Sequence, residues 1–193
     1  MPIHRRSFLK SSASLLPAMA LQNVLAQDSS GAPAAPGLHP VLAGEDRSGH
    51  LHSLGFSSLA FKVTPADTGG NLLMIEHKNL MPDTGPALHV HFSQEEWFYV
   101  MEGHVRFQVG DRRLELGPGD SFLAPRRIPH TFSATGAPAH MLIAFTPADK
   151  MEQYFIDAAA HPELAPTEAF MNRYDMKWIG PSPFWKNREQ GSK

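Results

Sequence analysis

Short stretches of alternating apolar and polar residues dominate the centre of the chain and predict β-strands. Val105, Phe107 and Val109 alternate with Arg106 and Gln108, which is the period of two expected of a half-buried strand. Glycine, proline and aspartate separate this stretch from other apolar runs, at residues 56–63, 71–76, 97–101, 114–116 and 140–145. Many short strands with turns between them predict a sandwich or barrel, and we assign it to residues 46–147.

The pattern changes after residue 145 and predicts helix. Residues 146–149 (Thr-Pro-Ala-Asp) are typical of a helix start, with threonine as N-cap and proline in the first turn. One face of this helix would carry Met151, Tyr154, Phe155, Ala158 and Ala159. A second short helix is expected at 167–173, followed by an extended segment at 174–184. We therefore expect residues 148–193 to form a helical and extended tail that packs on the barrel.

The N-terminal residues 1–26 have a different character. Arg5-Arg6-Ser7-Phe8-Leu9-Lys10 precedes a moderately apolar run that ends at Ala26. This segment resembles a twin-arginine export signal, which implies the twin-arginine export machinery as a partner and a periplasmic or secreted mature protein. The run is shorter than the ~20 residues of a membrane span and contains Pro17, so we expect no stable membrane insertion. Residues 27–45, rich in proline and small residues, predict a flexible linker.

Charge and composition exclude several classes of protein. The 193 residues include no cysteine, which excludes a disulfide scaffold and thiolate catalysis. The net charge is −2, and without residues 1–26 the chain has 14 basic and 19 acidic residues, a net charge of −5. That balance argues against a nucleic-acid partner, which requires a basic face. The 11 histidines direct attention to metal binding, because histidine is the commonest protein ligand of metals.

Three histidines and a carboxylate have the spacing of a metal site. His89 and His91 are two residues apart, so on a strand both imidazoles face the same side. Glu95 and Glu96 follow closely, and His130 lies on a different predicted strand about forty residues later. Three neutral imidazoles and one carboxylate suit a divalent transition metal with one or two open coordination positions.

These segments resemble the two motifs of the cupin superfamily. Six residues separate Glu96 from Gly103, which is the gap of the first motif and selects Glu96 over Glu95 as the ligand. The second motif is matched at Gly119, Pro125 and His130, but Arg127 stands where the family has glycine and Ala134 where it often has asparagine. The resemblance implies an all-β, cupin-type double-stranded β-helix (a jelly-roll barrel) with a short C-terminal helical extension.

The resemblance also implies a function. Residues 54–183 are similar to the single-domain, quercetin 2,3-dioxygenase-like cupins, so we expect a metal-dependent oxygenase that acts on a phenolic or enolic small molecule with dioxygen. His89, His91, Glu96 and His130 would hold iron, manganese, nickel, cobalt or copper. Glu96 would also accept the substrate's proton, and Phe98 and Phe132 would line the substrate pocket. Cupins of this type are often homodimers, which would cover exposed sheet edges.

Two other functions stay open at this point. The barrel could hold a small ligand without catalysis, or the site could be that of an isomerase, epimerase or decarboxylase of an acidic substrate. The latter needs a cationic pocket, and it would be favoured if Arg106, Arg126 or Arg127 pointed into the barrel. His50 and His52 also have the His-x-His spacing, but no carboxylate follows them four or five residues later in the sequence. We predict surface or structural roles for this pair and for His39, His77, His104, His140 and His161.

Overall fold

The computed structural model describes residues 39–165 and 167–186. The predicted export signal at 1–26 lies outside the described residues, as does the predicted linker up to residue 38, so both stay predictions. Within the described part, residues 42–49 run alongside strand β2 (Ser58–Val63). There the backbone N–H of Arg47 donates to the carbonyl oxygen of Phe61 at 2.8 Å. The Asp46 carboxylate accepts the Phe61 N–H at 2.5 Å.

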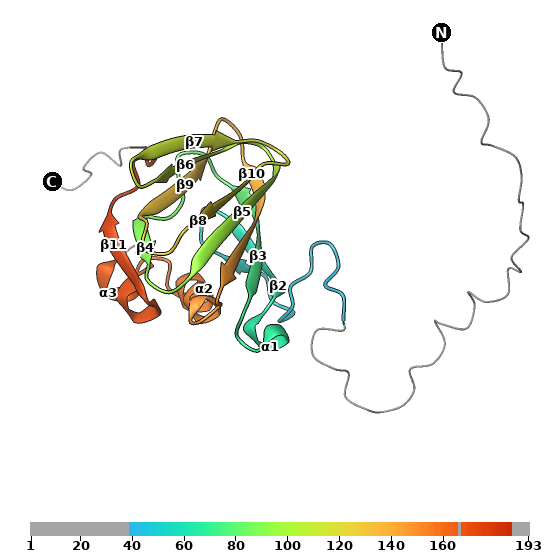
Figure 1. Cartoon of the computed structure of the whole chain (residues 1–193). Coiled ribbons are helices and arrows are strands. Elements are labelled where there is room, and N and C mark those ends of the chain that lie inside the picture. The colour runs from blue at the N-terminus through green and yellow to red at the C-terminus, as the bar shows by residue number, and fades with distance from the viewer. Residues whose placement is uncertain (1–38, 166, 187–193) are drawn as a thin grey trace, which may run out of the picture. The chain divides into compact units, whose positions relative to one another are not determined.

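Two antiparallel sheets form the body of the molecule (Figure 1). The six-stranded sheet has the order β1-β2-β3-β10-β5-β8, with bounds β1 His52–Ser53, β2 Ser58–Val63, β3 Leu73–Leu80, β10 Ala139–Thr146, β5 Glu95–Glu102 and β8 Ser121–Ala124. The five-stranded sheet has the order β11-β4-β9-β6-β7, with bounds β11 Met176–Gly180, β4 Leu88–His91, β9 His130–Ala134, β6 Val105–Val109 and β7 Arg112–Leu116. The predicted all-β fold with a short C-terminal helical extension is confirmed.

Alternation along the strands builds the core, as the sequence predicts. On β5, Phe98 and Val100 are fully buried between the sheets, whereas Trp97 and Tyr99 are half-buried on the outer face. β6 and β7 are joined by the two-residue turn Gly110-Asp111. Along β6, the alternation buries Val105, Phe107 and Val109. The largest fully buried side chains include Phe61, Phe98, Phe107, Phe145, Ile75, Met141 and Ile143.

The helix after the barrel begins later than the sequence predicts. Helix α2 spans Met151–Ala160, and the prediction of an N-cap at Thr146 is wrong. Thr146 is instead the last residue of β10, where it pairs with Glu95, and the residue that precedes the helix as its N-cap is Lys150. The predicted apolar face is confirmed in its centre, because Met151, Phe155 and Ala158 are buried.

Other short helices border the sheets. The segment before β3 contains a one-turn helix, α1 Pro65–Thr68, that ends at Gly69. The predicted second helix is confirmed as α3 Glu168–Met171, whose N-cap Thr167 accepts the N–H of Phe170, and the 3-10 helix η1 Asn172–Tyr174 follows it. None of the helices in the described part of the chain combines the length and apolar character that a membrane span requires.

The extended segment after the helices is a full strand of the second sheet. β11 pairs with β4, and Met176 and Trp178 lie opposite His91 and His89. The tail therefore does more than pack on the barrel. It hydrogen-bonds along the strand that carries two of the candidate metal ligands and fixes that strand in position.

Candidate metal centre

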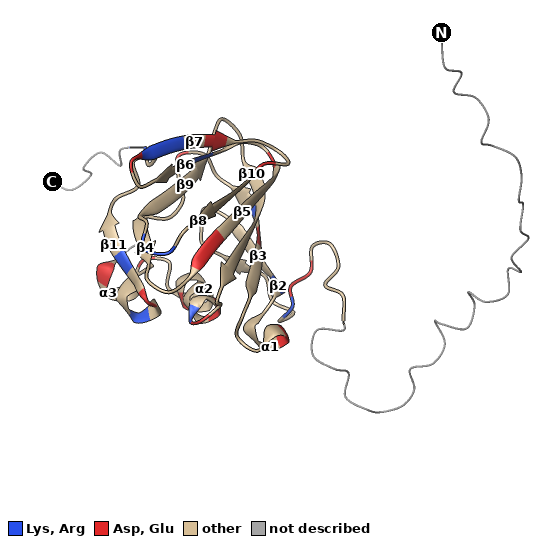
Figure 2. Cartoon of the chain, in the orientation of Figure 1, with Lys and Arg blue, Asp and Glu red and all other residues tan. Residues whose placement is uncertain are grey.

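Four side chains from three strands meet inside the sandwich. β4 carries His89 and His91, β5 carries Glu96 and β9 begins with His130. Figure 2 marks the acidic residues at the start of β5 in red. Each of the four residues is at most 5 % exposed, and one ligand atom from each lies within 4.8 Å of the other three. The cluster could therefore hold a metal ion.

Strand pairing explains why residues distant in sequence come together. His89 lies directly opposite His130 in the β4–β9 pair, and opposing residues in antiparallel strands have neighbouring side chains. The period of two along β4 places His91 on the same face as His89. Glu96 enters from the six-stranded sheet, so the cluster bridges the two sheets at the end where these strands meet.

Backbone carbonyls fix the orientation of two of the imidazoles. His89 Nδ1 lies 2.8 Å from the Ala87 carbonyl oxygen, and His130 Nδ1 lies 3.0 Å from the Ile128 carbonyl oxygen. A carbonyl oxygen can only accept a hydrogen bond, so each Nδ1 carries a hydrogen. In the neutral ring, Nε2 is then left with a free lone pair directed into the cluster. His89 Nε2 lies 3.1 Å from His91 Nε2, so the lone pair of His89 can accept a hydrogen bond from His91.

The carboxylate of Glu96 contacts the other two imidazoles. Its Oε2 lies 2.8 Å from His130 Nε2 and 3.2 Å from His91 Nε2. Burial on its own would raise the pKa of Glu96, but the hydrogen bonds from His130 and His91 outweigh it and lower the pKa. Burial likewise favours neutral His130, but the bond to Glu96 raises its pKa above the usual value. Burial and the neighbouring imidazoles lower the pKa of His89 to about 3.

This chemistry fits a divalent transition metal. A buried anionic carboxylate and imidazole lone pairs converge on one point, and each of these groups is stabilised by a cation placed between them. Nitrogen and oxygen donors of this kind bind the divalent ions of iron, manganese, nickel, cobalt and copper. His91 Nδ1 is buried and has no hydrogen-bond partner among the described residues.

The two predicted pocket residues lie beside the cluster. Phe98 is fully buried, with its ring centroid 6.3 Å from that of His130 and 5.4 Å from that of Phe132. Phe132 is 3 % exposed and also contacts Phe107. Both rings belong to the core next to the metal cluster, and their role in binding substrate stays a prediction.

The candidate arginines do not point into the barrel. Arg106 forms an ion pair with Asp83 at 2.6 Å and lies over the ring of Phe184. Arg126 pairs with Glu95 through both carboxylate oxygens at 2.5 Å, and Arg127 is exposed. The buried polar side chains of the described part include no arginine or lysine.

The departure from the motif at Arg127 leaves the local turn intact. Arg127 has φ of 65°, the left-handed conformation that glycine adopts most easily. Its backbone N–H donates to the His91 carbonyl oxygen at 2.7 Å, which ties the loop before His130 to the end of β4. Ala134, the second departure, is fully buried in β9 opposite Val105.

Sequence reasoning gave no functional role to His77, which the structure places inside the sandwich. His77 is 1 % exposed, and its Nδ1 lies 3.2 Å from Ser57 Oγ. The inward alternation of Leu73 and Ile75 continues to His77, and this signal could have found it. By contrast, the ring of His52 packs against that of Phe61, with 5.0 Å between the ring centroids. Residues 39–165 and 167–186 hold no second group of three potential metal ligands.

Comparison with known proteins places a named domain on this architecture. Residues 77–145 match the family model described as a cupin domain, a span that includes all four residues of the cluster. No curated protein matches the chain. Similar solved structures include KdgF from Halomonas sp., with 20 % identity, 51 % of this chain and 86 % of that chain covered, and a TM-score of 0.45.

Two further solved structures are similar. An RmlC-like cupin from Shewanella frigidimarina has 19 % identity, with 53 % of this chain and 87 % of that chain covered and a TM-score of 0.46. An oxalate decarboxylase variant from Bacillus subtilis has 21 % identity and a TM-score of 0.49. That alignment covers 74 % of this chain and 41 % of the decarboxylase.

Proposed function

Starting from a cupin domain at residues 77–145, we propose that the chain is a metal-dependent oxygenase of the quercetin 2,3-dioxygenase-like type. Its substrate would be a phenolic or enolic small molecule, with dioxygen as the second substrate. The observation that carries the proposal is the buried cluster of His89, His91, Glu96 and His130. A donor set of this composition leaves coordination positions for a substrate oxygen.

The metal and the chain have separate tasks in this proposal. A bound divalent metal supplies a Lewis acid that stabilises the negative charge of an ionised substrate hydroxyl. The Ala87 and Ile128 carbonyl oxygens orient the imidazoles of His89 and His130, so these rings need no rearrangement to bind. The sheets that bury all four residues exclude water from the reacting groups.

Glu96 is the proposed proton acceptor. Without a metal, the hydrogen bonds from His130 and His91 lower its pKa despite burial, and a bound metal cation would likewise keep the carboxylate ionised. A substrate hydroxyl next to the cluster could give its proton to the Glu96 oxygen that His130 and His91 now contact. Glu96 would then act both as a ligand and as the general base.

The interior favours an uncharged aromatic substrate over an acidic one. Phe98 and Phe145 lie close to imidazoles of the cluster, and Phe132 packs against Phe98. The buried polar side chains of the described residues include no arginine or lysine. An anionic substrate in this interior would lack a cation other than the metal. This observation supports a phenolic substrate and weakens the alternative of a decarboxylase or isomerase of acids.

Oxygen uptake with a flavonol panel tests the proposal. The mature chain, loaded separately with iron, manganese, nickel, cobalt or copper, is mixed with flavonols in air-saturated buffer. We expect oxygen uptake and loss of flavonol absorbance with at least one metal, and no uptake by Glu96→Gln. Metal-loaded protein that binds flavonols without consuming oxygen would instead be a non-catalytic binder. Metal-loaded protein that neither binds flavonols nor consumes oxygen would refute the flavonol proposal.

We also propose export by the twin-arginine machinery, on the basis of the sequence at Arg5 and Arg6. Replacement of both arginines by lysine should keep the protein in the cytoplasm, as cell fractionation would show. Equal periplasmic amounts of the two proteins would contradict this proposal.

A further inference from the structure

Two rows of aromatic rings lead from the metal cluster to His77. In the first row, Phe98 lies 6.3 Å from His130, Phe132 lies 5.4 Å from Phe98, and His77 lies 6.2 Å from Phe132, all between ring centroids. The successive contacts form an unbroken wall inside the sandwich. Its two phenylalanines are the residues that the sequence predicts as pocket-lining.

The second row reaches His77 from a different metal ligand. Phe145 lies 5.7 Å from His91, Phe155 lies 5.6 Å from Phe145, and His77 lies 6.2 Å from Phe155. Phe145 belongs to β10, whereas Phe155 belongs to helix α2. Together the two rows form an apolar region that has the metal cluster at one end and His77 at the other.

His77 brings an unsatisfied polar atom to this apolar region. Its Nδ1 contacts Ser57 Oγ, which orients the ring, but its Nε2 is buried and has no partner among the described residues. Burial lowers the pKa of His77 to about 3 against the opposing effect of the Glu96 carboxylate, so the ring is neutral. An unpaired buried nitrogen lowers the stability of the fold, and an apolar residue at this position would avoid that loss.

We propose that His77 is a specificity-determining residue whose Nε2 hydrogen-bonds the end of an aromatic substrate that lies farthest from the metal. This inference rests on the proposed function and adds the substrate's shape: flat, uncharged, and polar at both ends. The metal would hold one end, the phenylalanine rings would pack against its faces, and His77 would select for a hydroxyl or carbonyl at the other end.

Helix α2 is the element that would have to shift to admit such a substrate. The rings fill the region in the structure, and Phe155 is the one of the four phenylalanines in the two rows that lies on a helix rather than on a strand. The N-terminal approach to α2 is joined to the metal-site loop by a hydrogen bond from Gln94 Nε2 to Asp149 Oδ2 at 3.0 Å. Near its C-terminal end, the helix is joined to Tyr174 through Asp157. A small outward shift of α2 would let a substrate ring replace the ring of Phe155.

Two substitutions distinguish the roles of the two ring nitrogens of His77. Asparagine places a polar atom near the position of Nδ1, so His77→Asn keeps a partner for Ser57 and removes Nε2. Glutamine reaches the position of Nε2, so His77→Gln restores a polar atom there. Metal content and melting temperature of each variant show first that the metal site and the fold are intact.

The probes are two flavonols that differ at the end far from the chelating group. 3-Hydroxyflavone carries only the chelating hydroxyl and carbonyl, whereas quercetin has further hydroxyls on both outer rings. Dissociation constants are measured anaerobically on the metal-loaded holoprotein, and KM and kcat are measured in air. We expect the wild type to prefer quercetin by about tenfold, the effect of one buried hydrogen bond. His77→Asn should lose this preference and bind 3-hydroxyflavone as the wild type does, and His77→Gln should regain part of it.

Each other outcome has a distinct meaning. Equal binding of the two flavonols by the wild type, or equal weakening of both by His77→Asn at unchanged metal content, would overturn the role of His77 and leave the proposed function standing. Failure of the metal-loaded wild type to bind either flavonol would overturn both. Should His77→Asn not fold, Ser57→Ala keeps both nitrogens, removes the orienting hydrogen bond, and should reduce the same preference by a smaller factor.

Discussion

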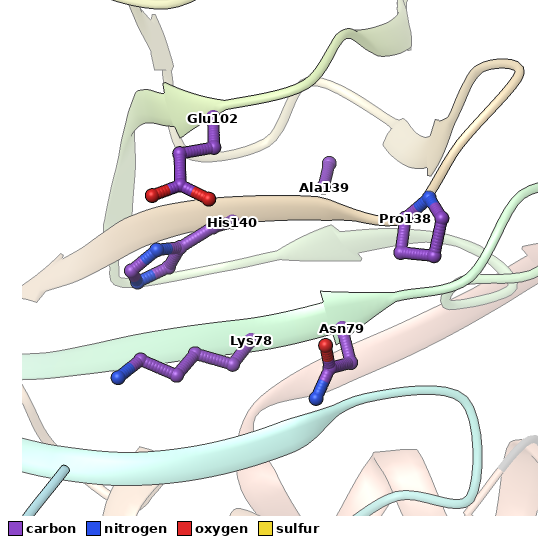
Figure 3. A pocket seen from close by; sticks show the side chains of 6 residues that line it. All are labelled: Lys78, Asn79, Glu102, Pro138, Ala139 and His140. Atoms are coloured by element: carbon purple, nitrogen blue, oxygen red, sulfur yellow. The ribbon is translucent and has the colours of Figure 1, made fainter.

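Two buried glutamates lie on opposite faces of the six-stranded sheet and have opposite kinds of partner. Glu76, on the outer face, is 7 % exposed and forms ion pairs with Lys62 at 2.9 Å and Lys78 at 3.3 Å, and it contacts His140 at 2.7 Å. Figure 3 shows Lys78 on β3 and His140 on the adjacent strand β10, where both line a pocket. Glu96, on the inner face, is 3 % exposed, and the polar partners of its carboxylate among the described residues are the imidazoles of His91 and His130.

The difference concerns the source of the positive charge. Lysine carries a permanent charge at neutral pH, so the Glu76 cluster is complete within the chain. The imidazoles around Glu96 carry a charge only when protonated, and two of them are fixed with a lone pair towards the cluster when they are neutral. The charge of the Glu76 carboxylate is therefore balanced by lysines, whereas the Glu96 carboxylate and the oriented imidazoles around it could together bind a metal cation.

The largest expected effect is the loss of the metal from the inner cluster. Glu96→Gln removes the only anionic donor of the four and should weaken metal binding at least about 100-fold, with loss of activity. Metal titration by calorimetry measures the affinity. The matched control is Glu95→Gln, because Glu95 is the neighbouring residue but pairs with Arg126 outside the cluster. Equal affinities for Glu96→Gln and Glu95→Gln would remove the basis of the comparison.

His77 extends the comparison to a buried group that has no charged partner. Its pKa of about 3 means that the folded chain keeps it neutral while the unfolded chain protonates it below pH 6.5. The free energy of unfolding should therefore fall as pH falls from 6.5 to about 3, by about 1.4 kcal/mol per pH unit for this one group. Denaturation of metal-free His77→Gln and wild type across this range isolates the effect. Parallel curves for the two proteins would show that His77 does not contribute.

The outer cluster should influence stability and leave metal binding unchanged. Glu76→Gln leaves Lys62 without its buried partner and should lower the free energy of unfolding by about 1–2 kcal/mol. Burial favours the protonated form of Glu76, but its bonds to Lys62, His140 and Lys78 lower the pKa. The stabilisation is thus present above the ordinary carboxyl pKa and is lost as pH falls through the lowered value. Denaturant unfolding checks the size, and a weakened metal affinity in Glu76→Gln would contradict the separation of the two clusters.

The smallest expected effect is at Arg127, in the loop that precedes His130. Arg127 occupies a left-handed conformation at φ of 65°, which costs a residue with a Cβ about 1 kcal/mol relative to glycine. Arg127→Gly should raise the free energy of unfolding by about 0.5–1 kcal/mol and leave metal affinity unchanged, because only the backbone N–H contacts His91. A destabilised Arg127→Gly would indicate that the exposed side chain has a packing role.

Local patterns account for what the sequence predicts correctly. Alternation places Glu96, Phe98 and Val100 on one face of β5, and the His-x-His spacing places two imidazoles on one face of β4. Both are properties of a single strand. The third imidazole, at His130, is predicted by the resemblance to the second cupin motif, and the structure places it opposite His89.

Long-range pairing accounts for what the sequence does not predict. Nothing within residues 176–180 specifies β4 as the partner of β11, because that choice depends on which sheet edge remains open. The misplaced start of α2 has the same origin, since the pairing of Thr146 with Glu95 overrides a local capping pattern. His77 was missed because the predicted strand ended at residue 76, one position before it.

A crystal structure of the metal-loaded protein, with anomalous diffraction recorded at the absorption edge of the added metal, tests the central claim most directly. We expect one anomalous peak per chain, within about 2.0–2.3 Å of Nε2 of His89, His91 and His130 and of a carboxylate oxygen of Glu96. The contradicting result would be a peak elsewhere, or none at saturating metal, with the Glu96 carboxylate still hydrogen-bonded to His91 and His130 as in the metal-free cluster.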